Sequence, residues 1–256
     1  MKASKRILEL QEVDSVSIGS RGDILRCAEN FRDIAARYGL RVVAWHDLGS
    51  ADPMTSEDGE PLCTSVFSVP GIEGEWHLLA RRQYSPVVDL CRYQTEPFWG
   101  NATNGFTLRH PTPYADKVDF NWVWANTQAR STLVIPVHMQ LGQVGLVGFL
   151  SDSEDVDFET CVDHLSWLSH AFLSSYVRAN TVTKRAQVYE PLSPREIDCL
   201  SWAFDGKTDR DIAEITGRSY ATVRYYISSA TIKLGAVNRA QTLARAAALG
   251  YFSARR

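Results

Sequence analysis

The stretch TDRDIAEITGRSYATVRYYI, residues 208–227, holds two short helical patterns separated by one glycine. Thr208 stands where a helix N-cap is expected, directly before the first pattern. Gly217 permits a tight turn because it lacks a Cβ atom. Ser219 caps the next helix, which is expected to run to about Leu234. Two helices joined in this way predict a helix-turn-helix unit over 208–227.

The flanking sequence completes a small helical domain. Ser193 and Glu196 form a capping box, and Pro194 lies at a first-turn position where its missing N–H costs nothing. Asn238 caps a final helix that is rich in Ala and Leu. We therefore predict an all-α four-helix domain over residues 192–256.

The helix after Gly217 is predicted to have two distinct faces. At 100° per residue, its core face consists of Val223, Ile227, Ala230 and Leu234. The opposite face carries Ala221, Tyr225, Ser228 and Ile232, edged by Thr222, Arg224 and Ser229. Neither set contains an acid. Small and polar residues near a helix N-terminus, with one Arg and one Tyr, suit a DNA major groove.

The charge distribution of the C-terminal region also favours a polyanion partner such as DNA. Glu214 is the last acidic residue of the chain. The Lys and Arg residues that follow it, with no acid among them, are Arg218, Arg224, Lys233, Arg239, Arg245, Arg255 and Arg256. A field of one sign over a short segment is expected for a polyanion partner. The alternative is a solvated basic surface.

This C-terminal region resembles the DNA-binding domain of LuxR-type transcription regulators. The resemblance rests on "LSPRE", "GKTDRDIA", "TVR" and "KLGAVNRAQ", and it covers about residues 192–252. It implies that Lys207, Thr222 and Arg224 contact DNA and that the last helix contributes to a dimer. Thr216 and Arg218 stand where the family has apolar residues, and we expect Arg218 to reach a phosphate. The full predicted DNA-binding set is Lys207, Thr208, Arg218, Ser219, Thr222, Arg224, Tyr225 and Ser228. Alternatively, Lys207 is a solvated loop lysine and Tyr225 a surface aromatic.

Residues 1–176 predict a second domain in which helices alternate with strands. Helices are expected over residues 23–38, 73–84, 86–94, 117–130 and 157–176. Strands are expected over residues 40–48, 63–69, 131–139 and 145–151. The last two strands are adjacent in sequence and compatible with antiparallel pairing. We predict an α+β protein, with an N-terminal α-β-α sandwich around an antiparallel sheet and a linker over 177–191.

The N-terminal pattern resembles the autoinducer-binding domain of quorum-sensing LuxR proteins, which bind N-acyl-homoserine lactones. The resemblance rests on Trp76, Pro86-Val87, Pro97-Phe98-Trp99 and Arg130-Ser131 with Ile135-Pro136. In the family a Trp donates to the lactone carbonyl, an Asp accepts from the amide N–H and a Tyr donates to the acyl carbonyl. The predicted ligand-binding set is Trp76, Tyr84, Ser85, Phe98, Trp99 and Thr132. Alternatively, Trp76 and Trp99 are core aromatics.

Three positions depart from the family's ligand pattern. Ser85 stands where the family has Asp, Ala80 where it has Tyr, and Thr132 where it has a pocket glycine. Tyr84 is a candidate substitute for the missing Tyr. Loss of a charged acceptor costs about 1.5–3 kcal/mol. The ligand is therefore an atypical acyl-homoserine lactone, another small apolar molecule or none. The last case describes a ligand-independent "solo" regulator, and a heterodimerising anti-regulator is a further alternative.

Other classes of protein are disfavoured. The chain begins without the apolar segment of a secretory signal, and its five cysteines are widely spaced. No apolar run approaches the length of a membrane helix, and we find no metal-binding or nucleophile motif. We expect a cytoplasmic dimer that binds double-stranded DNA at a two-fold operator. It is expected to have no enzymatic activity and no cofactor beyond a small-molecule effector.

Overall fold

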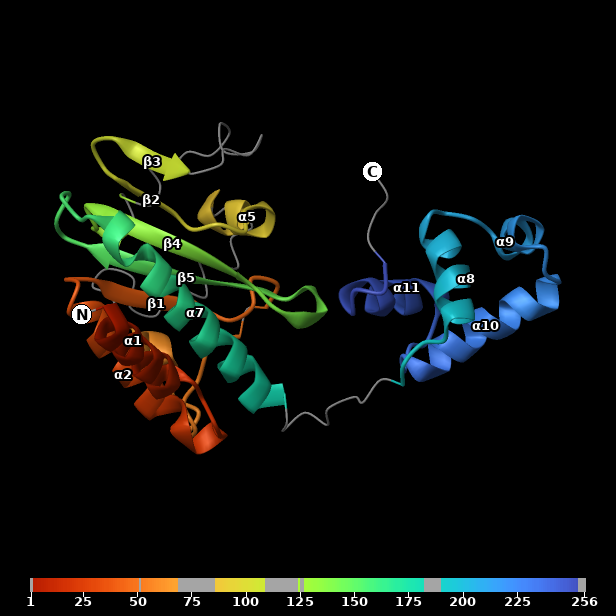
Figure 1. Cartoon of the computed structure of the whole chain (residues 1–256), viewed down its shortest axis with the longest axis horizontal. Helices are drawn as coiled ribbons and strands as arrows, with labels where there is room; N and C mark the ends of the chain where they lie inside the picture. The colour runs from red at the N-terminus through yellow and green to blue at the C-terminus, as the bar shows by residue number, and fades with distance from the viewer. Residues whose placement is uncertain are drawn as a thin grey trace. The chain divides into compact units, whose positions relative to one another are not determined.

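The computed structural model describes residues 2–50, 52–68, 86–108, 124, 127–181 and 190–252. The chain divides into two compact units, and the boundary along the sequence lies between Lys184 and Arg185. The first unit is a sheet with helices packed against it, and the second is a group of four helices (Figure 1).

One antiparallel sheet of five strands forms the centre of the first unit. Its strand order is β1-β5-β4-β2-β3. The long central pair β4 and β5 places Ile135 opposite Val147, and Ala44 of β1 lies opposite Val147 on the other side. The strands are β1 Arg41–Trp45, β2 Phe98–Asn101, β3 Gly105–Leu108, β4 Ser131–His138 and β5 Val144–Ser151.

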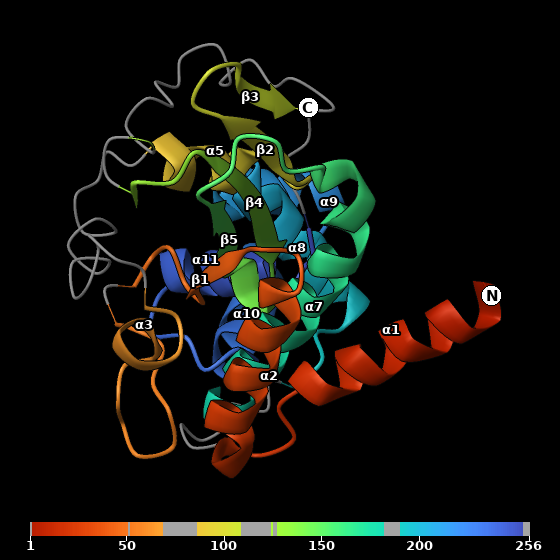
Figure 2. The ribbon, with the colours of Figure 1, turned by 90° about the vertical axis from the view of Figure 1, so that its left-hand side faces the viewer.

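Two helices, α2 (Ile24–Ala36) and α7 (Phe158–Thr181), cover one face of this sheet, and α1 (Lys2–Val16) packs against both of them (Figures 1 and 2). Phe31 of α2 meets Phe172 of α7 at 5.2 Å and Phe149 of β5 at 5.9 Å, measured between ring centroids. Alternate residues of β4 point into this core because successive side chains of a strand face opposite sides. The β4 residues that point into this core are Leu133, Ile135 and Val137.

The other face of the sheet packs against α5 (Pro86–Tyr93). Leu90 and Cys91 of this helix are buried against Phe98, Val134 and Leu146 of the strands. Helices on both faces of an antiparallel sheet confirm the predicted α-β-α sandwich. The described part of the chain before the helical unit also contains three short elements, η1 (Arg21–Asp23), α3 (Leu62–Ser65) and η3 (Gln140–Gly142).

Several sequence-based expectations for this unit were wrong or incomplete. The strand predicted over 63–69 is contradicted, because α3 occupies Leu62–Ser65. Here tertiary contacts override β propensity, since Phe67 packs edge-on against Phe31 and Phe172. The helix α1 and the hairpin β2–β3 were not predicted.

Some boundaries also differ from the expectation. The helix α7 continues to Thr181, so the first five residues of the predicted linker, 177–181, are helical. The helix expected over 73–84 and most of the one expected over 117–130 lie outside the described residues.

The second unit consists of α8 (Pro194–Phe204), α9 (Asp209–Thr216), α10 (Tyr220–Lys233) and α11 (Arg239–Ala248). These match the four predicted helices. Ser193, Thr208, Ser219 and Asn238 each accept a hydrogen bond from a backbone N–H of the helix they cap. The core of this unit includes Leu200, Ile212, Val223, Ile227, Ala230 and Leu234.

Candidate nucleic-acid interface

The turn between α9 and α10 has the geometry of a helix-turn-helix. Thr208 Oγ1 accepts from the Asp211 N–H at 3.3 Å, and the Thr208 N–H donates to the Asp211 carboxylate at 2.8 Å. Gly217 ends α9 in the left-handed conformation, with φ of 65°. That conformation costs a side-chain-bearing residue free energy, so glycine suits this position.

The helix α10 has one buried and one exposed face, as its sequence predicts. Val223, Ile227 and Ala230 point into the core of the unit. On the opposite face, 68% of Tyr225 and 79% of Ile232 are exposed. Ala221 and Ser228 are exposed on the same face. The side of α10 that faces away from the core is therefore available to a partner.

Arg224 is the exposed cation of this helix. Its guanidinium lies 6.0 Å from the centroid of the Tyr220 ring, a distance typical of a cation–π contact. The Tyr225 ring lies edge-on to Tyr226 at 5.7 Å. These contacts support both side chains from within α10.

Two predicted DNA-binding residues also have structural roles at the start of α10. Ser219 Oγ accepts from the Thr222 N–H at 3.1 Å. The two hydroxyl groups of Ser219 and Thr222 lie 2.8 Å apart and share a hydrogen bond. Both hydroxyl groups therefore lie at the N-terminus of α10, where partial positive charge favours an anion such as phosphate.

Arg218 has internal partners, in contrast to the predicted phosphate contact. Its guanidinium pairs with the Asp198 carboxylate at 3.3 Å, and its side chain is only 16% exposed. It also lies 5.6 Å from the Tyr226 ring centroid and 3.8 Å from the Cys199 sulfur. Arg218 thus connects the turn to α8 and α10. The phosphate contact of Arg218 stays a prediction, made for a side chain that is held within the domain.

The predicted ligand-binding residues of the first unit do not share one face of the sheet. Phe98 is fully buried toward α5, where its ring lies 5.8 Å from Phe106. Thr132 is buried and follows the same alternation as Val134, which also faces α5. Trp99 points to the opposite side and packs against the core covered by α7. Trp76, Tyr84 and Ser85 lie outside the described residues.

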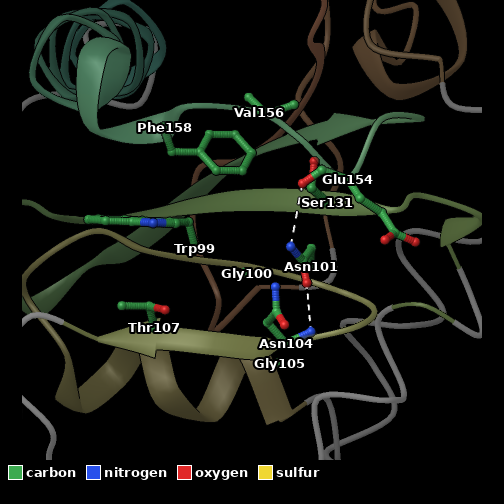
Figure 3. Close-up of a pocket in the computed structure, with 10 residues that line it drawn as sticks. All are labelled: Trp99, Gly100, Asn101, Asn104, Gly105, Thr107, Ser131, Glu154, Val156 and Phe158. Atoms are coloured by element: carbon green, nitrogen blue, oxygen red, sulfur yellow. Dashed lines mark hydrogen bonds between the residues drawn. The ribbon is translucent and has the colours of Figure 1, made fainter.

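A small open cleft lies on the Trp99 side of the sheet, with a volume of about 190 Å³ (Figure 3). Its polar groups are largely bonded to one another. Asn101 Oδ1 accepts from the Asn104 N–H at 2.7 Å, and Asn101 Nδ2 donates to the Glu154 carbonyl at 3.4 Å. Of the predicted ligand-binding residues that the structure describes, Trp99 alone lines this cleft. The cleft is therefore distinct from the α5 face that carries Phe98 and Thr132.

Comparison with known proteins identifies the helical unit. Residues 190–246 match the family "Bacterial regulatory proteins, luxR family". The transcriptional activator protein AhyR of Aeromonas hydrophila is 31% identical over 178 residues, which is 68% of this chain and 66% of AhyR. The chain belongs to the luxR family of bacterial regulatory proteins. This is a family of transcription regulators and not of enzymes.

Two further matches differ in their extent. VjbR of Brucella ovis, named as an HTH-type quorum sensing-dependent transcriptional regulator, is 51% identical to the LuxR-family chain over 59 residues, 23% of each protein. The structure of SdiA in complex with octanoyl-rac-glycerol matches 96% of this chain and 94% of its own chain, with 16% identity and a TM-score of 0.49. The alignment with AhyR spans just under two thirds of that relative's length.

In this LuxR-family chain, Glu196 makes contacts that its sequence pattern only partly predicted. Glu196 was predicted as the cap of α8, and its carboxylate does accept from the Ser193 N–H at 2.6 Å. It also accepts from Ser229 Oγ at 2.7 Å and from Lys233 Nζ at 2.9 Å, both on α10. Burial opposes ionisation of Glu196, but the hydrogen bonds from Ser229, Ser193 and Lys233 outweigh it and lower the pKa to about 2. The carboxylate is therefore charged at neutral pH.

The loop that carries Lys207 is held by α11. Arg239 donates to the Lys207 carbonyl at 2.8 Å and forms an ion pair with Asp209. Arg245 donates to the carbonyl groups of Leu234 and Gly235 at the end of α10. Arg239 and Arg245 therefore serve structure within the LuxR-family domain.

These contacts correct the charge argument made from the sequence. Four of the seven cations that follow Glu214 have partners within the domain: Arg218, Lys233, Arg239 and Arg245. Arg224 is exposed on the outward side, and residues 253–256 lie outside the described part of the chain. The positive charge offered to a polyanion is thus concentrated at fewer positions than the sequence suggested.

Proposed function

We propose that this LuxR-family protein is a transcription regulator that binds double-stranded DNA through α10. The observation that carries the proposal is the outward side of this helix, which exposes Arg224, Tyr225 and Ser228 beside a capped N-terminus. Side chains there contact base edges, and the helix N-terminus contacts phosphate. We assign phosphate contacts to Lys207, Thr208, Ser219 and Thr222.

The expected DNA site is two-fold. A homodimer that pairs through α11 would present two copies of α10 to half-sites spaced by about one turn of DNA, or roughly 34 Å. The resemblance to LuxR-type regulators supports this arrangement, and such a protein acts in the cytoplasm.

The interface is tested by Arg224→Ala. Because Arg224 is exposed and its guanidinium lies over the neighbouring Tyr220 ring, this substitution should leave folding intact and remove specific DNA binding. A gel-shift assay on a duplex that the wild-type chain selects from random sequences, with circular dichroism to check folding, gives the answer. Unchanged specific binding by the Ala variant would show that α10 does not read the site.

We infer that the N-terminal unit senses an N-acyl-homoserine lactone or a related small apolar ligand. Support comes from the sequence resemblance and from the name of VjbR as a quorum-sensing-dependent regulator. The sheet face against α5, which carries Phe98 and Thr132, is the proposed side for the ligand. Ser85 in place of Asp would accept the ligand's amide N–H without a charge, which predicts weaker or altered ligand preference.

Ser85 in place of the family's Asp also favours a second candidate function, that of a solo regulator that acts without ligand. Thermal unfolding of the purified full chain against a panel of acyl-homoserine lactones distinguishes the two. A ligand at one hundred times its Kd stabilises the protein by about 2.7 kcal/mol. Matched fatty acids without the lactone ring serve as controls. A panel in which no member raises the melting temperature would favour the solo regulator.

A heterodimerising anti-regulator is the remaining alternative. Such a protein would not need a DNA-reading surface, whereas Arg224 and Tyr225 are present and exposed here. Specific binding by the purified chain alone would exclude this alternative.

A further inference from the structure

The outward face of α10 exposes two large apolar side chains, those of Tyr225 and Ile232. Tyr225 is 68% exposed, and Ala221 lies one turn before it on the same face. The buried face of α10 already supplies its share of the domain core, so the exposed Tyr225 ring is not needed for packing. An aromatic ring left in solvent on a recognition helix suggests an apolar feature of the partner.

The residue types of α10 limit what it can read by hydrogen bonds. Residues 220–233 contain no Asn, Gln, Asp or Glu. Bidentate amide readers of adenine and carboxylate acceptors for the cytosine amino group are therefore absent from this helix. Its two cations differ in their availability, because Lys233 is paired with Glu196 and Arg224 is exposed. Arg224 is the group on α10 suited to guanine.

One apolar group is displayed in the major groove, the 5-methyl group of thymine. We propose that the Tyr225 ring packs against a thymine 5-methyl group in each half-site, in addition to the contact of Arg224 with guanine. This inference rests on the proposed function and specifies the base chemistry that the site recognises. The small side chain of Ala221 leaves room for the base edge to approach the ring.

Ile232 provides a matched control on the same face. It is 79% exposed, but it lies seven residues after Tyr225, or roughly 10 Å further along the helix axis. Base contacts in helix-turn-helix proteins come from the N-terminal part of the recognition helix. We therefore assign the thymine contact to Tyr225 and not to Ile232.

The test replaces thymine by uracil, which removes only the methyl group. The full-length chain first selects its site from random duplexes, with and without a mixture of acyl-homoserine lactones. Each thymine of the selected site is then changed singly to uracil, and the affinity is measured. One uracil position per half-site should weaken binding about fourfold, the value expected for losing one buried methyl-sized group.

Variants of Tyr225 and Ile232 test whether the Tyr225 ring is responsible for this loss of affinity. Tyr225→Ala should bind thymine and uracil sites equally, whereas Tyr225→Phe and Ile232→Ala should keep the difference of about fourfold. The inference is overturned if no uracil substitution affects the wild-type chain, or if Tyr225→Ala keeps the same sensitivity. It is also overturned if Tyr225→Ala lowers the oligomeric state while uracil has no effect, because the face would then pack against protein. A chain that selects no sequence under either condition refutes the proposed function itself.

Discussion

Lys233 Nζ lies 2.9 Å from Glu196 Oε2, so the last turn of α10 is tied to the first turn of α8. The same carboxylate caps α8 through the Ser193 N–H. One residue that is only 3% exposed therefore both caps α8 and fixes the position of α10. Removing one partner of such a pair leaves a buried polar group unsatisfied, so substitutions here should be costly.

Replacing Glu196 should destabilise the helical unit in a pH-dependent way. The pKa of Glu196 is lowered from an ordinary value of 4.5 to about 2, so the folded state favours the ionised form. Its stabilisation is fully present above pH 4.5 and is lost as pH falls toward 2. The shift corresponds to the order of 3 kcal/mol. Urea unfolding from pH 7 to pH 3 should show this loss in the wild type and a flatter profile in Glu196→Gln.

Asp211 gives the control for this experiment. It caps α9 through Thr208 at the surface, and those hydrogen bonds lower its pKa. Because solvent screens an exposed group, Asp211→Asn should change the pH profile much less. Equal effects of the two substitutions would contradict a special role for the buried carboxylate.

Arg218 and Arg224 should separate stability from DNA binding. Arg218→Ala removes the ion pair with Asp198 and the contact with the Tyr226 ring, at a cost of about 1–2 kcal/mol. Arg224→Ala should change the free energy of unfolding by less than about 0.5 kcal/mol. Denaturant unfolding and salt-dependent DNA binding, measured on both variants, check the contrast. A lower salt dependence in the Arg218 variant, with unchanged stability, would restore its predicted phosphate contact.

Gly217→Ala should destabilise the helix-turn-helix because alanine must adopt the left-handed backbone conformation of Gly217. A Cβ atom at this position would meet nothing within 4 Å, so no steric clash contributes. The left-handed conformation costs an Ala about 1–2 kcal/mol. Gly217→Asn should cost less, since Asn tolerates this conformation better. Thermal unfolding of both variants tests the order, and an Asn variant less stable than the Ala variant would refute it.

Gly100→Ala should disturb the hairpin of β2 and β3 in the first unit. A Cβ atom there would lie 2.2 Å from the Gly105 carbonyl oxygen, which is backbone and cannot turn away. We expect a loss of at least about 2 kcal/mol, within the usual range for overpacking. Gly19→Ala is the matched control, because its nearest neighbour would be 3.5 Å away. Equal melting temperatures for the two variants would argue against this hairpin geometry.

The helical unit was predictable because its signals are local. Capping residues such as Ser193 and Thr208 act on N–H groups within three positions, and Gly217 acts on its own backbone. These signals were sufficient to predict α8–α11. The sheet unit was less predictable because its elements depend on distant partners. The short strand β2, for example, exists through pairing with β4, at least thirty positions away.

Tertiary packing also fixed the placement of elements that the sequence pattern did not determine. The helix α1 contains many charged residues, and its place is set by contacts such as Arg37 with Glu12 and Ile18 N–H with Ser175 Oγ. Phe98 and Trp99 must face opposite sides of a strand, but only the packing of α5 and α7 determines which side each one takes.

The sequence by itself determined the number, order and caps of the C-terminal helices, the alternation of the sheet residues and the absence of acids after Glu214. Only the tertiary structure decided which cations remain available to a partner. Arg218, Lys233 and Arg239 pair with acids that precede them by 20, 37 and 30 positions. Coulombic attraction depends on distance in space and not on separation along the chain, so a charge count cannot separate these paired residues from Arg224.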